Sequence, residues 1–390
     1  MKNFIFKTFL FVSLLMSAVF YGQCPDPVTN SSYFFFTNGT HQLRFTSQAQ
    51  LDQFIIDFPN CTSIDYHTVV VGSGITSVLP LQNITHVKRL SITDAINLVS
   101  LNGLQNLTSI SGQLSIKNSG LSNLQGLHNL ASIGNTNDSS IGNNLLLETN
   151  SSLTSITALS NLNYLGGLSL TLNHVLTSLT GLENIQSEIP GSVSFNGGIV
   201  FSSMEALDGI TSIDGILMIK DCPSLVSLSG LDELTSVGGQ LQITNNDALV
   251  SLVSLENLNS AGDLLINANE SLVSIEALSG MTSVNLGINI ANNPNLASLN
   301  GLQNVTLAAG DPNYINSGVY IGYNNSLTSL NGLQGIVNLI GQLDRIAITN
   351  NANLSSLQGL NNLDKVRKLQ ITNNPLLTSL EGLEGLTKVE

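Results

Sequence analysis

The sequence predicts a mainly β protein whose chain winds into a parallel β-solenoid. A motif L-x-S-L-x-G-L-x-x-L, seen at residues 225–234, recurs along most of the chain, and L-x-I-x-x-N follows it, as at residues 241–246. Most copies lie 23 to 25 residues apart, a period typical of arrays in which each unit buries its apolar face against its neighbours. With no Trp and only 5% aromatic residues, the core has to be built from Leu, Ile and Val.

Thirteen repeats are visible when the residue after the recurring Ser is taken as an anchor. The Ser is present in all repeats but one, where Asn123 replaces it, and it suggests an internal row of hydrogen bonds. The anchors are Val78, Leu101, Leu124, Ile156, Leu179, Met204, Leu228, Leu252, Ile275, Leu299, Leu330, Leu357 and Leu380.

Residues 1–23 read as a signal peptide. Lys2 and Lys7 flank the start of an apolar run at 9–20, which is too short for a good membrane span, and cleavage is expected near Gly22 or Gln23. Lipidation of Cys24 is the alternative, but Gln23 stands where a lipid-attachment motif usually has a small residue. The soluble secreted form is therefore favoured, and no later segment is apolar enough to span a membrane.

Residues 24–60 are expected to form a leader and a helical cap. Ser47 is a suitable N-cap, apolar residues follow it at helical spacing from Leu51 to Phe58, and Pro59 ends the helix. An oxidising compartment favours a disulfide between Cys24 and Cys61, which would hold the cap over the first coil. The alternative is two unpaired thiols in an unstructured leader.

The solenoid is expected over residues 61–390. Each L-x-I supplies a short strand with its aliphatic residues inward and its middle residue outward, and successive strands pair in parallel about 4.8 Å apart. Turns, extended segments and an occasional 3₁₀ turn are expected opposite. The outward row is nearly uncharged and fits a recognition face or a plain solvated sheet equally well: Ser91, Ser115, Leu146, Ser169, Ser194, Met218, Gln242, Leu265, Asn289, Tyr320, Ala347 and Gln370.

An Asn recurs three residues after the second aliphatic of each strand, where the chain bends. Its amide can satisfy backbone groups of adjacent coils, so the residues predict a structural ladder rather than a catalytic site. Cys222 stands at the same position and is expected to be a small buried thiol. The ladder comprises Asn150, Asn173, Asn246, Asn269, Asn293, Asn324, Asn351 and Asn374.

Three repeats carry insertions at the equivalent point before the strand, at about 134–144, 309–318 and 340–345. Equivalent points of a solenoid lie along one edge, and insertions on one edge often mark a binding side. Neutral drift at a tolerant turn is the competing explanation. The candidate ligand-contact residues in these loops are Asp138, Asn143, Asp311, Tyr314, Asn316 and Asp344.

The strand-and-turn L-x-I-x-x-N is similar to the L-x-L-x-x-N of leucine-rich repeats, and the S-L-x-G-L half resembles receptor L-domain-like repeats of secreted bacterial and fungal wall proteins. The segment from Ser47 to Cys61 resembles the opening of many such bacterial proteins. The resemblance implies a right-handed parallel β-solenoid of about 13 coils of 23–24 residues with an N-terminal helical cap. It implies surface, adhesion or ligand-binding roles. The ladder Asn is missing at Ala95, Ser119 and Gly198, where local looseness is expected.

Charge and motif content argue against several functions. The formal charge is −14, and Lys220 is the only Lys or Arg between Lys117 and Arg345, so nucleic acid and anionic membranes are disfavoured partners. The five His are scattered, and no hydrolase or metal motif is present. Asp214 and Asp221 could be imagined as a carboxylate pair, but solvating acids explain them better. We expect no enzyme, cofactor or metal.

The last repeat is cut short at residues 385–390, which predicts either end-to-end contact through an uncapped coil or further coils and a sorting domain beyond it. The sequence thus favours a secreted or cell-surface, non-catalytic recognition or adhesion module that binds an extracellular glycan or protein along one edge. The alternative is a structural spacer that carries another surface domain.

Overall fold

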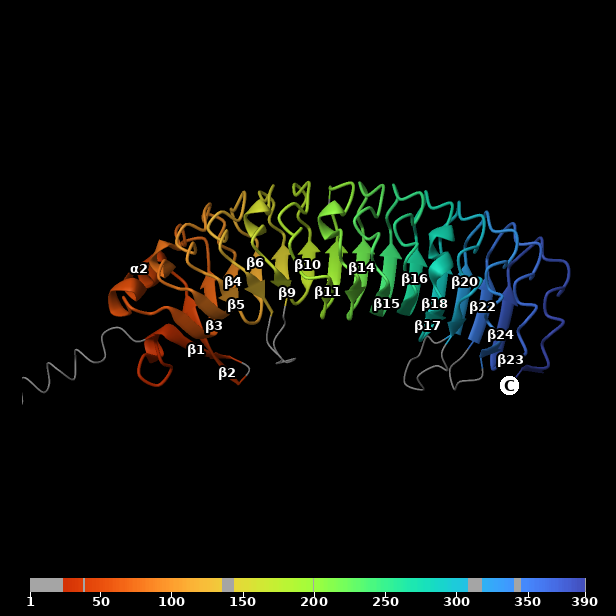
Figure 1. The fold of residues 1–390 in the computed structure, drawn as a ribbon, viewed down its shortest axis with the longest axis horizontal. Coiled ribbons are helices and arrows are strands. Elements are labelled where there is room, and N and C mark those ends of the chain that lie inside the picture. The colour runs from red at the N-terminus through yellow and green to blue at the C-terminus, as the bar shows by residue number, and fades with distance from the viewer. Residues whose placement is uncertain are drawn as a thin grey trace, which may run out of the picture. The chain divides into compact units, whose positions relative to one another are not determined.

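The computed structural model describes residues 24–37, 39–134, 144–198, 200–307, 318–339 and 345–389. The predicted signal peptide, residues 1–23, lies outside them. The chain divides into two compact units, Met1–Leu165 and Gly166–Glu390. Each unit is a winding of short parallel strands, as the sequence predicted, so the fold is a leucine-rich-repeat type of β-solenoid (Figure 1).

The first unit opens with an antiparallel hairpin and continues as parallel strands. Strand β2 pairs with β3, and β3, β4, β6 and β8 follow in register, one strand from each coil. Its elements are η1 (Ser31–Tyr33), β1 (Phe34–Thr37), β2 (Thr40–Phe45), α2 (Gln48–Asp57), β3 (Ser63–Val71), η2 (Leu79–Leu81), β4 (His86–Thr93), β5 (Ser109–Ile110), β6 (Leu114–Lys117), β7 (Ser132–Ile133), β8 (Leu145–Glu148), η3 (Thr157–Leu159) and β9 (Tyr164–Leu165).

Helix α2 is the predicted cap. The Ser47 hydroxyl accepts a hydrogen bond from the Gln50 amide at 3.4 Å, and α2 packs against η2 of the first coil. Gln48 strengthens that contact, because its side-chain oxygen accepts bonds from the amides of Thr76 and Ser77, both at 3.0 Å. The buried face of α2 presents Leu51 and Phe54 to the end of the solenoid, where they shield apolar side chains from water.

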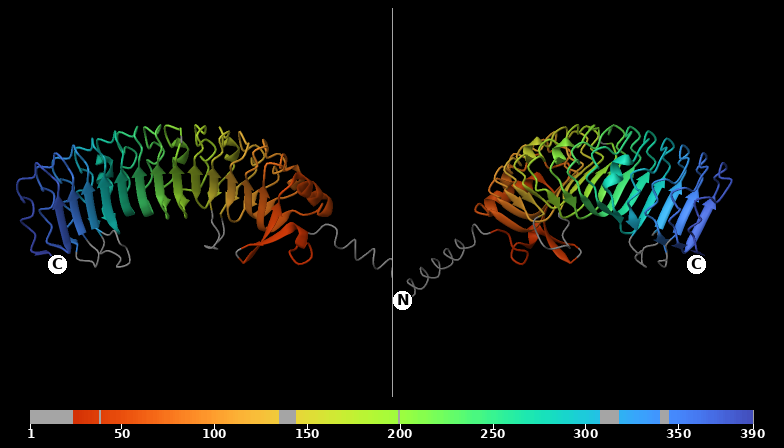
Figure 2. Two further views of the ribbon diagram at one scale, coloured as in Figure 1. Left: turned by 180° about the vertical axis from the view of Figure 1, so that it is seen from behind. Right: turned by 45° about the vertical axis from the view of Figure 1, so that its right-hand side comes forward.

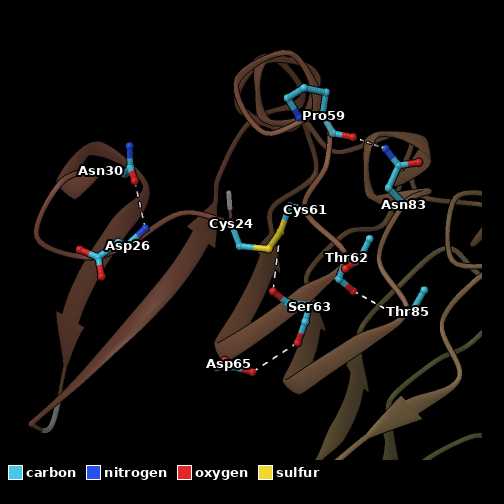
Figure 3. Close-up of a disulfide and its surroundings, with 10 residues drawn as sticks. All are labelled: Cys24, Asp26, Asn30, Pro59, Cys61, Thr62, Ser63, Asp65, Asn83 and Thr85. Carbon is cyan, nitrogen blue, oxygen red and sulfur yellow. Dashed lines mark hydrogen bonds between the residues drawn. A yellow bond between two sulfur atoms is a disulfide. The ribbon is translucent and has the colours of Figure 1, made fainter. Parts of the chain in front are cut away.

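Cys24 and Cys61 form a disulfide, the pairing that the sequence favoured (Figure 3). Their Cα atoms lie 4.6 Å apart, and the bridge spans 37 residues. It ties the start of the described chain to Cys61, two residues before β3, so the hairpin and α2 are both held against the first coil. Hydrogen bonds between coils begin here, with Asn83 Nδ2 donating to the Pro59 carbonyl at 2.8 Å.

The second unit repeats the same winding. One strand of each coil pairs in parallel with the next, in the order β10, β12, β14, β15, β16, β18, β20, β22 and β24 (Figure 2). The elements are β10 (Leu168–Thr171), β11 (Glu188–Ile189), β12 (Val193–Asn196), η4 (Glu205–Leu207), β13 (Ser212–Ile213), β14 (Leu217–Lys220), β15 (Ser236–Thr244), β16 (Ser260–Asn267), η5 (Glu276–Gly280), β17 (Ser283–Val284), β18 (Gly287–Ala291), β19 (Thr306–Leu307), β20 (Gly318–Gly322), β21 (Asn338–Leu339), β22 (Arg345–Thr349), β23 (Lys365–Val366), β24 (Lys368–Thr372) and β25 (Lys388–Val389).

The core consists of files of aliphatic side chains. Leu241 and Ile243 of β15 are fully buried, and the register places them beside Leu264 and Ile266 of β16. Each such side chain contributes roughly 1.5–3 kcal/mol by leaving water. One coil cannot offset its own backbone ordering, about 1–2 kcal/mol per residue, without a neighbour to complete the file. The array is therefore stable only as a stack.

The half of the coil opposite the strands takes one of two forms, set by a single residue. Where the motif has Gly, as at Gly301, φ is 115° and the segment is a turn. Where Ala replaces it, at Ala158, Ala206 and Ala277, a 3₁₀ helix forms instead. Gly301 also allows close stacking, since a Cβ there would lie 2.2 Å from the Ile275 carbonyl of the preceding coil.

The Ser row before the anchors was predicted to lie inside, and that prediction was wrong. Ser298 and Ser356 are partly exposed, and each hydroxyl accepts a bond from the amide two residues later in its own coil, at 3.0 Å and 3.1 Å. These hydroxyls therefore shape the turn of their own coil, because a short hydroxyl readily satisfies a neighbouring backbone group.

Candidate recognition surface

A hollow of about 280 Å³ lies on the outward face of the second unit's strands. Side chains alternate between the two faces of a strand, so the residues flanking the buried aliphatics of β15, β16, β18, β20 and β22 point away from the core. The hollow is lined by ten of these and neighbouring residues: Gln240, Asp263, Leu265, Gly287, Ile288, Asn289, Gly318, Val319, Tyr320 and Arg345.

Two glycines produce the depression. Along one outward row the register pairs Gln240 with Asp263, Gly287 with Gly318, and Gly318 with Arg345. The pairing of Leu264 with Ile288 places Asp263 next to Gly287 in the same row. Glycine has no side chain, so the floor between Asp263 and Arg345 is backbone.

The neighbouring outward row forms the side of the hollow. It contains Leu265, Asn289 and Tyr320, which the register places beside one another. Asn289 is exposed, and Tyr320 is half-buried with its hydroxyl 3.3 Å from the Thr349 hydroxyl. An amide, a phenol ring and an aliphatic side chain therefore line one wall.

The two ends of the hollow carry opposite charges. Asp263 accepts a hydrogen bond from Gln240 Nε2 at 2.7 Å, and burial raises the pKa of its carboxyl although this bond opposes the shift. Arg345 is half-buried at the other end. Within the described residues, neither Asp263 nor Arg345 belongs to an ion pair.

The six loop residues that the sequence nominated cannot be placed on this surface. Asp138, Asn143, Asp311, Tyr314, Asn316 and Asp344 all lie outside the described residues. In the sequence, however, two of the three insertions end next to the hollow, one before Gly318 and one before Arg345. The outward row and the edge carrying insertions were predicted as separate candidate surfaces, and at these two residues they meet.

Gln240, Asp263 and Arg345 were missed because only the middle residue of each L-x-I was considered as outward-facing. The strands extend beyond that triplet: β15 begins at Ser236 and β16 at Ser260. The residue just before the first aliphatic therefore also points outward. Gly287 and Gly318 stand at this position in consecutive repeats, and that coincidence was the available signal.

The Asn residues nominated from the sequence lie in the interior. Seven are fully buried, and Asn374 is 9% exposed. Asn269 shows the pattern: its Oδ1 accepts from the Asn246 amide at 3.0 Å, and its Nδ2 donates to the Ile243 carbonyl at 3.0 Å. Both partners belong to the preceding coil, so the side-chain amide of Asn269 links its own coil to the one before it. Asn293, Asn324, Asn351 and Asn374 repeat this geometry.

Ser119 and Ala95, where looseness was predicted, are packed. Ser119 is 5% exposed, and its hydroxyl donates to Asn150 Oδ1 at 2.7 Å, so it takes part in the same row. Ala95 is fully buried.

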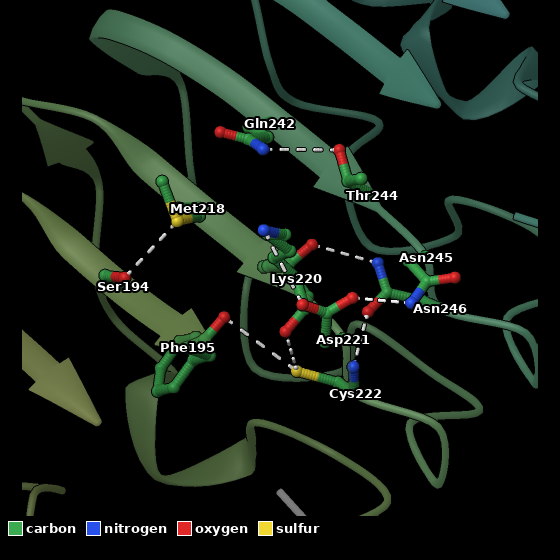
Figure 4. Close-up of polar contacts among 11 residues, drawn as sticks. Ser194, Phe195, Met218, Lys220, Asp221, Cys222, Gln242, Thr244, Asn245 and Asn246 are labelled. Carbon is green, nitrogen blue, oxygen red and sulfur yellow. Dashed lines mark hydrogen bonds and ion pairs between the residues drawn. The ribbon is translucent and has the colours of Figure 1, made fainter. Parts of the chain in front are cut away.

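Cys222 is a buried thiol inside this row (Figure 4). Its amide donates to Asn246 Oδ1 at 3.1 Å, and its Sγ lies 3.2 Å from the Lys220 carbonyl and 3.9 Å from the Phe195 carbonyl. The coil before it has Gly198, whose amide donates to the Asp221 carbonyl instead of to position 222. No acceptor is needed from the side chain at 222, which explains why a thiol is tolerated.

Cys222 is expected to resist thiol reagents in the folded protein. Burial raises the pKa of its thiol to about 12, so almost none is thiolate at pH 8, and no solvent reaches it. Labelling with an aromatic disulfide reagent should be negligible in buffer and complete in denaturant. Stoichiometric labelling of the folded protein would contradict this structural role.

The acids considered as a catalytic pair are apart. Asp214 precedes β14 and Asp221 follows it, so the four residues of this strand, a length of about 13 Å, lie between them. Glycosidase carboxylates lie about 5–10 Å apart. Asp221 is 3.6 Å from Lys220 Nζ, an ordinary surface contact. In the described part of the chain, no group of three or more His, Cys, Asp or Glu is placed to hold a metal ion. Nor does any helix there have the length and apolar character to cross a membrane.

No family model and no curated protein matches the chain. Among solved structures it is similar to an internalin from Listeria monocytogenes strain 4b F2365, with 17% identical residues over 90% of this chain and 85% of that one, and a TM-score of 0.40. The strand register and the buried Asn contacts define the fold independently of this likeness.

Proposed function

We propose that the protein is a secreted or cell-surface, non-catalytic recognition module that binds an extracellular glycan or protein. The observation that carries this proposal is the hollow on the outward strand face, where Asp263 and Arg345 form no ion pair with any described residue and Tyr320 lies beside them. Small-molecule sites combine an apolar or aromatic wall with a few placed polar groups, and this hollow has that composition.

Two features support export. The Cys24–Cys61 disulfide belongs to an oxidising compartment, and an apolar segment preceded by Lys2 and Lys7 stands at the start of the sequence. We assign residues 1–23 as a signal peptide, 24–60 as leader and cap, and 61–390 as solenoid.

The acidic surface limits the partner. Residues 118–344 contain a single basic residue, Lys220, and cannot neutralise a phosphate backbone, so nucleic acid is a poor candidate. Glycans and proteins bind through hydrogen bonds and small apolar contacts, which the Ser-, Asn- and Gln-rich outward row offers.

The test is a binding array. The purified protein, expressed with its native N-terminal segment, is applied to panels of glycans and extracellular proteins, alongside a variant in which the three insertions are shortened to standard turns. We expect capture of a defined ligand, weakened in the shortened variant because two insertions adjoin the hollow. Empty arrays would remove the proposal in favour of a structural spacer that holds another domain away from the cell.

A further inference from the structure

The outward strand face of the second unit contains one place where a cation, an anion and an aromatic ring surround a floor without side chains. We infer that this hollow binds a short oligosaccharide bearing a single carboxylate, with Arg345 holding the carboxylate and Asp263 receiving hydroxyl groups at the other end. This inference rests on the proposed function and names its ligand class.

The dimensions fit a short chain of sugar rings. Asp263 and Arg345 are three coil steps apart in one row, which is about 14 Å between their backbones. A volume of about 280 Å³ is at the low end for small-molecule sites, too small for a folded partner. The backbone floor at Gly287 and Gly318 lets a ligand lie along the row across the strands.

The walls offer what a pyranose requires. Its axial C–H groups are weakly positive and pack on the negative face of an aromatic ring such as Tyr320. Its hydroxyls need acceptors and donors close together, which Asp263, Gln240 and Asn289 supply. Hydrogen bonds from hydroxyls to the Asp263 carboxylate are charge-assisted, and the partial burial of that group strengthens them.

Arg345 adds the preference for a carboxylate. Its guanidinium is planar and can bind a carboxylate through two parallel hydrogen bonds, which an ammonium group cannot reproduce. Arg345 is also the first Lys or Arg after Lys220, and it is the only Lys or Arg among the residues that line the hollow.

The surrounding charge limits the ligand to one carboxylate. Residues 166–390 contain 19 Asp and Glu against 6 Lys and Arg, a formal charge of −13. A polyuronate would place further anions against this surface and be repelled. A single uronate among neutral sugars avoids that repulsion.

The experiment is calorimetric titration of the whole protein with four probes. These are a trisaccharide with one terminal glucuronic acid, the same compound with the carboxylate converted to a carboxamide, the neutral glucose-terminated trisaccharide, and polygalacturonate. We expect the uronate to bind at least about tenfold more tightly than the carboxamide or the neutral compound, and polygalacturonate to bind weakly.

The matched variants are R345Q and K368Q. Lys368 is exposed and is the register partner of Arg345 on the next strand, β24. K368Q therefore removes the same charge from the same row at a residue that does not line the hollow. R345Q should weaken uronate binding at least about tenfold and leave the neutral compound within about twofold, while K368Q should leave both within about twofold. Circular dichroism checks that each variant is folded.

The inference is overturned if R345Q and K368Q behave alike, if the carboxamide binds as well as the uronate, or if polygalacturonate binds most tightly. A ligand found on the arrays whose binding ignores R345Q leaves the recognition function standing and refutes the hollow as its site. If the arrays capture no ligand, both the recognition function and this inference are refuted.

Discussion

Replacing Asn269 with Ala is expected to lower the free energy of unfolding by about 3–5 kcal/mol. The amide of Asn246 and the carbonyl of Ile243 would both lose their partner in a fully buried region, at roughly 1–3 kcal/mol each, and the shortened side chain would leave a small void. Chemical denaturation followed by far-ultraviolet circular dichroism measures the loss.

Asn257 provides the control for that substitution. Its side chain also bonds to the preceding coil, donating to the Asp232 carbonyl at 2.7 Å, but it is exposed and water can replace it. Asn257→Ala should change the unfolding free energy by no more than about 0.5 kcal/mol. Similar losses for the two variants would show that the buried row contributes no more than surface contacts.

The second large effect is expected at Gly301, where Ala should cost about 3 kcal/mol or more. Its φ of 115° is unfavourable for any residue with a side chain, and the added Cβ would lie 2.2 Å from the Ile275 carbonyl and 3.1 Å from the Glu276 Cα. The coil that contains Gly301 would have to move away from the coil that contains Ile275, which disrupts the close packing of aliphatic side chains between them. Thermal or chemical unfolding measures the cost.

Gly209 separates strain from steric contact. It has a φ of 97°, and an added Cβ would meet nothing within 4 Å. Gly209→Ala should therefore cost only the backbone strain, about 1–2 kcal/mol. If both substitutions cost the same, the close approach of coils at Gly301 has no energetic consequence.

The sequence predicted the winding because two independent signals repeat with one period. The aliphatic pairs such as Leu241 and Ile243 define which strand residues point inward, and the fixed interval between copies sets the register. In the structure these pairs lie beside Leu264 and Ile266. The helical cap could also be predicted from the sequence, since Ser47 and Pro59 mark the helix ends by local rules that need no tertiary context.

The candidate recognition surface was harder to predict. The hollow depends on Asp263, Gly287, Gly318 and Arg345 lying in one row, and these residues share no motif. They become neighbours only through the pairing of four strands and through strand lengths that exceed the L-x-I triplet. The predicted loop residues fall outside the described residues, so their role stays a prediction.

Two other features depend on detail that spacing does not contain. The Ser row repeats as regularly as the Asn row, yet its hydroxyls bond within their own coil, because a short side chain reaches its own backbone first. The direction of the Asn contacts, such as the two bonds from the Asn269 side chain to the preceding coil, follows from amide orientation and could not be derived from the repeat period.

Because Cys222 has a thiol where most coils have the side-chain amide of an Asn, its coil is less strongly linked to the preceding coil. Asn246 and Asn269 each donate a hydrogen bond of about 3 Å to a carbonyl of the preceding coil, whereas Phe195 is offered only a thiol at 3.9 Å. Tension along the molecule would concentrate at that junction. If the protein bears load, we expect the coils that contain Gly198 and Cys222 to separate more readily than the coils linked by Asn246 to Asn374, which include the strands of the hollow.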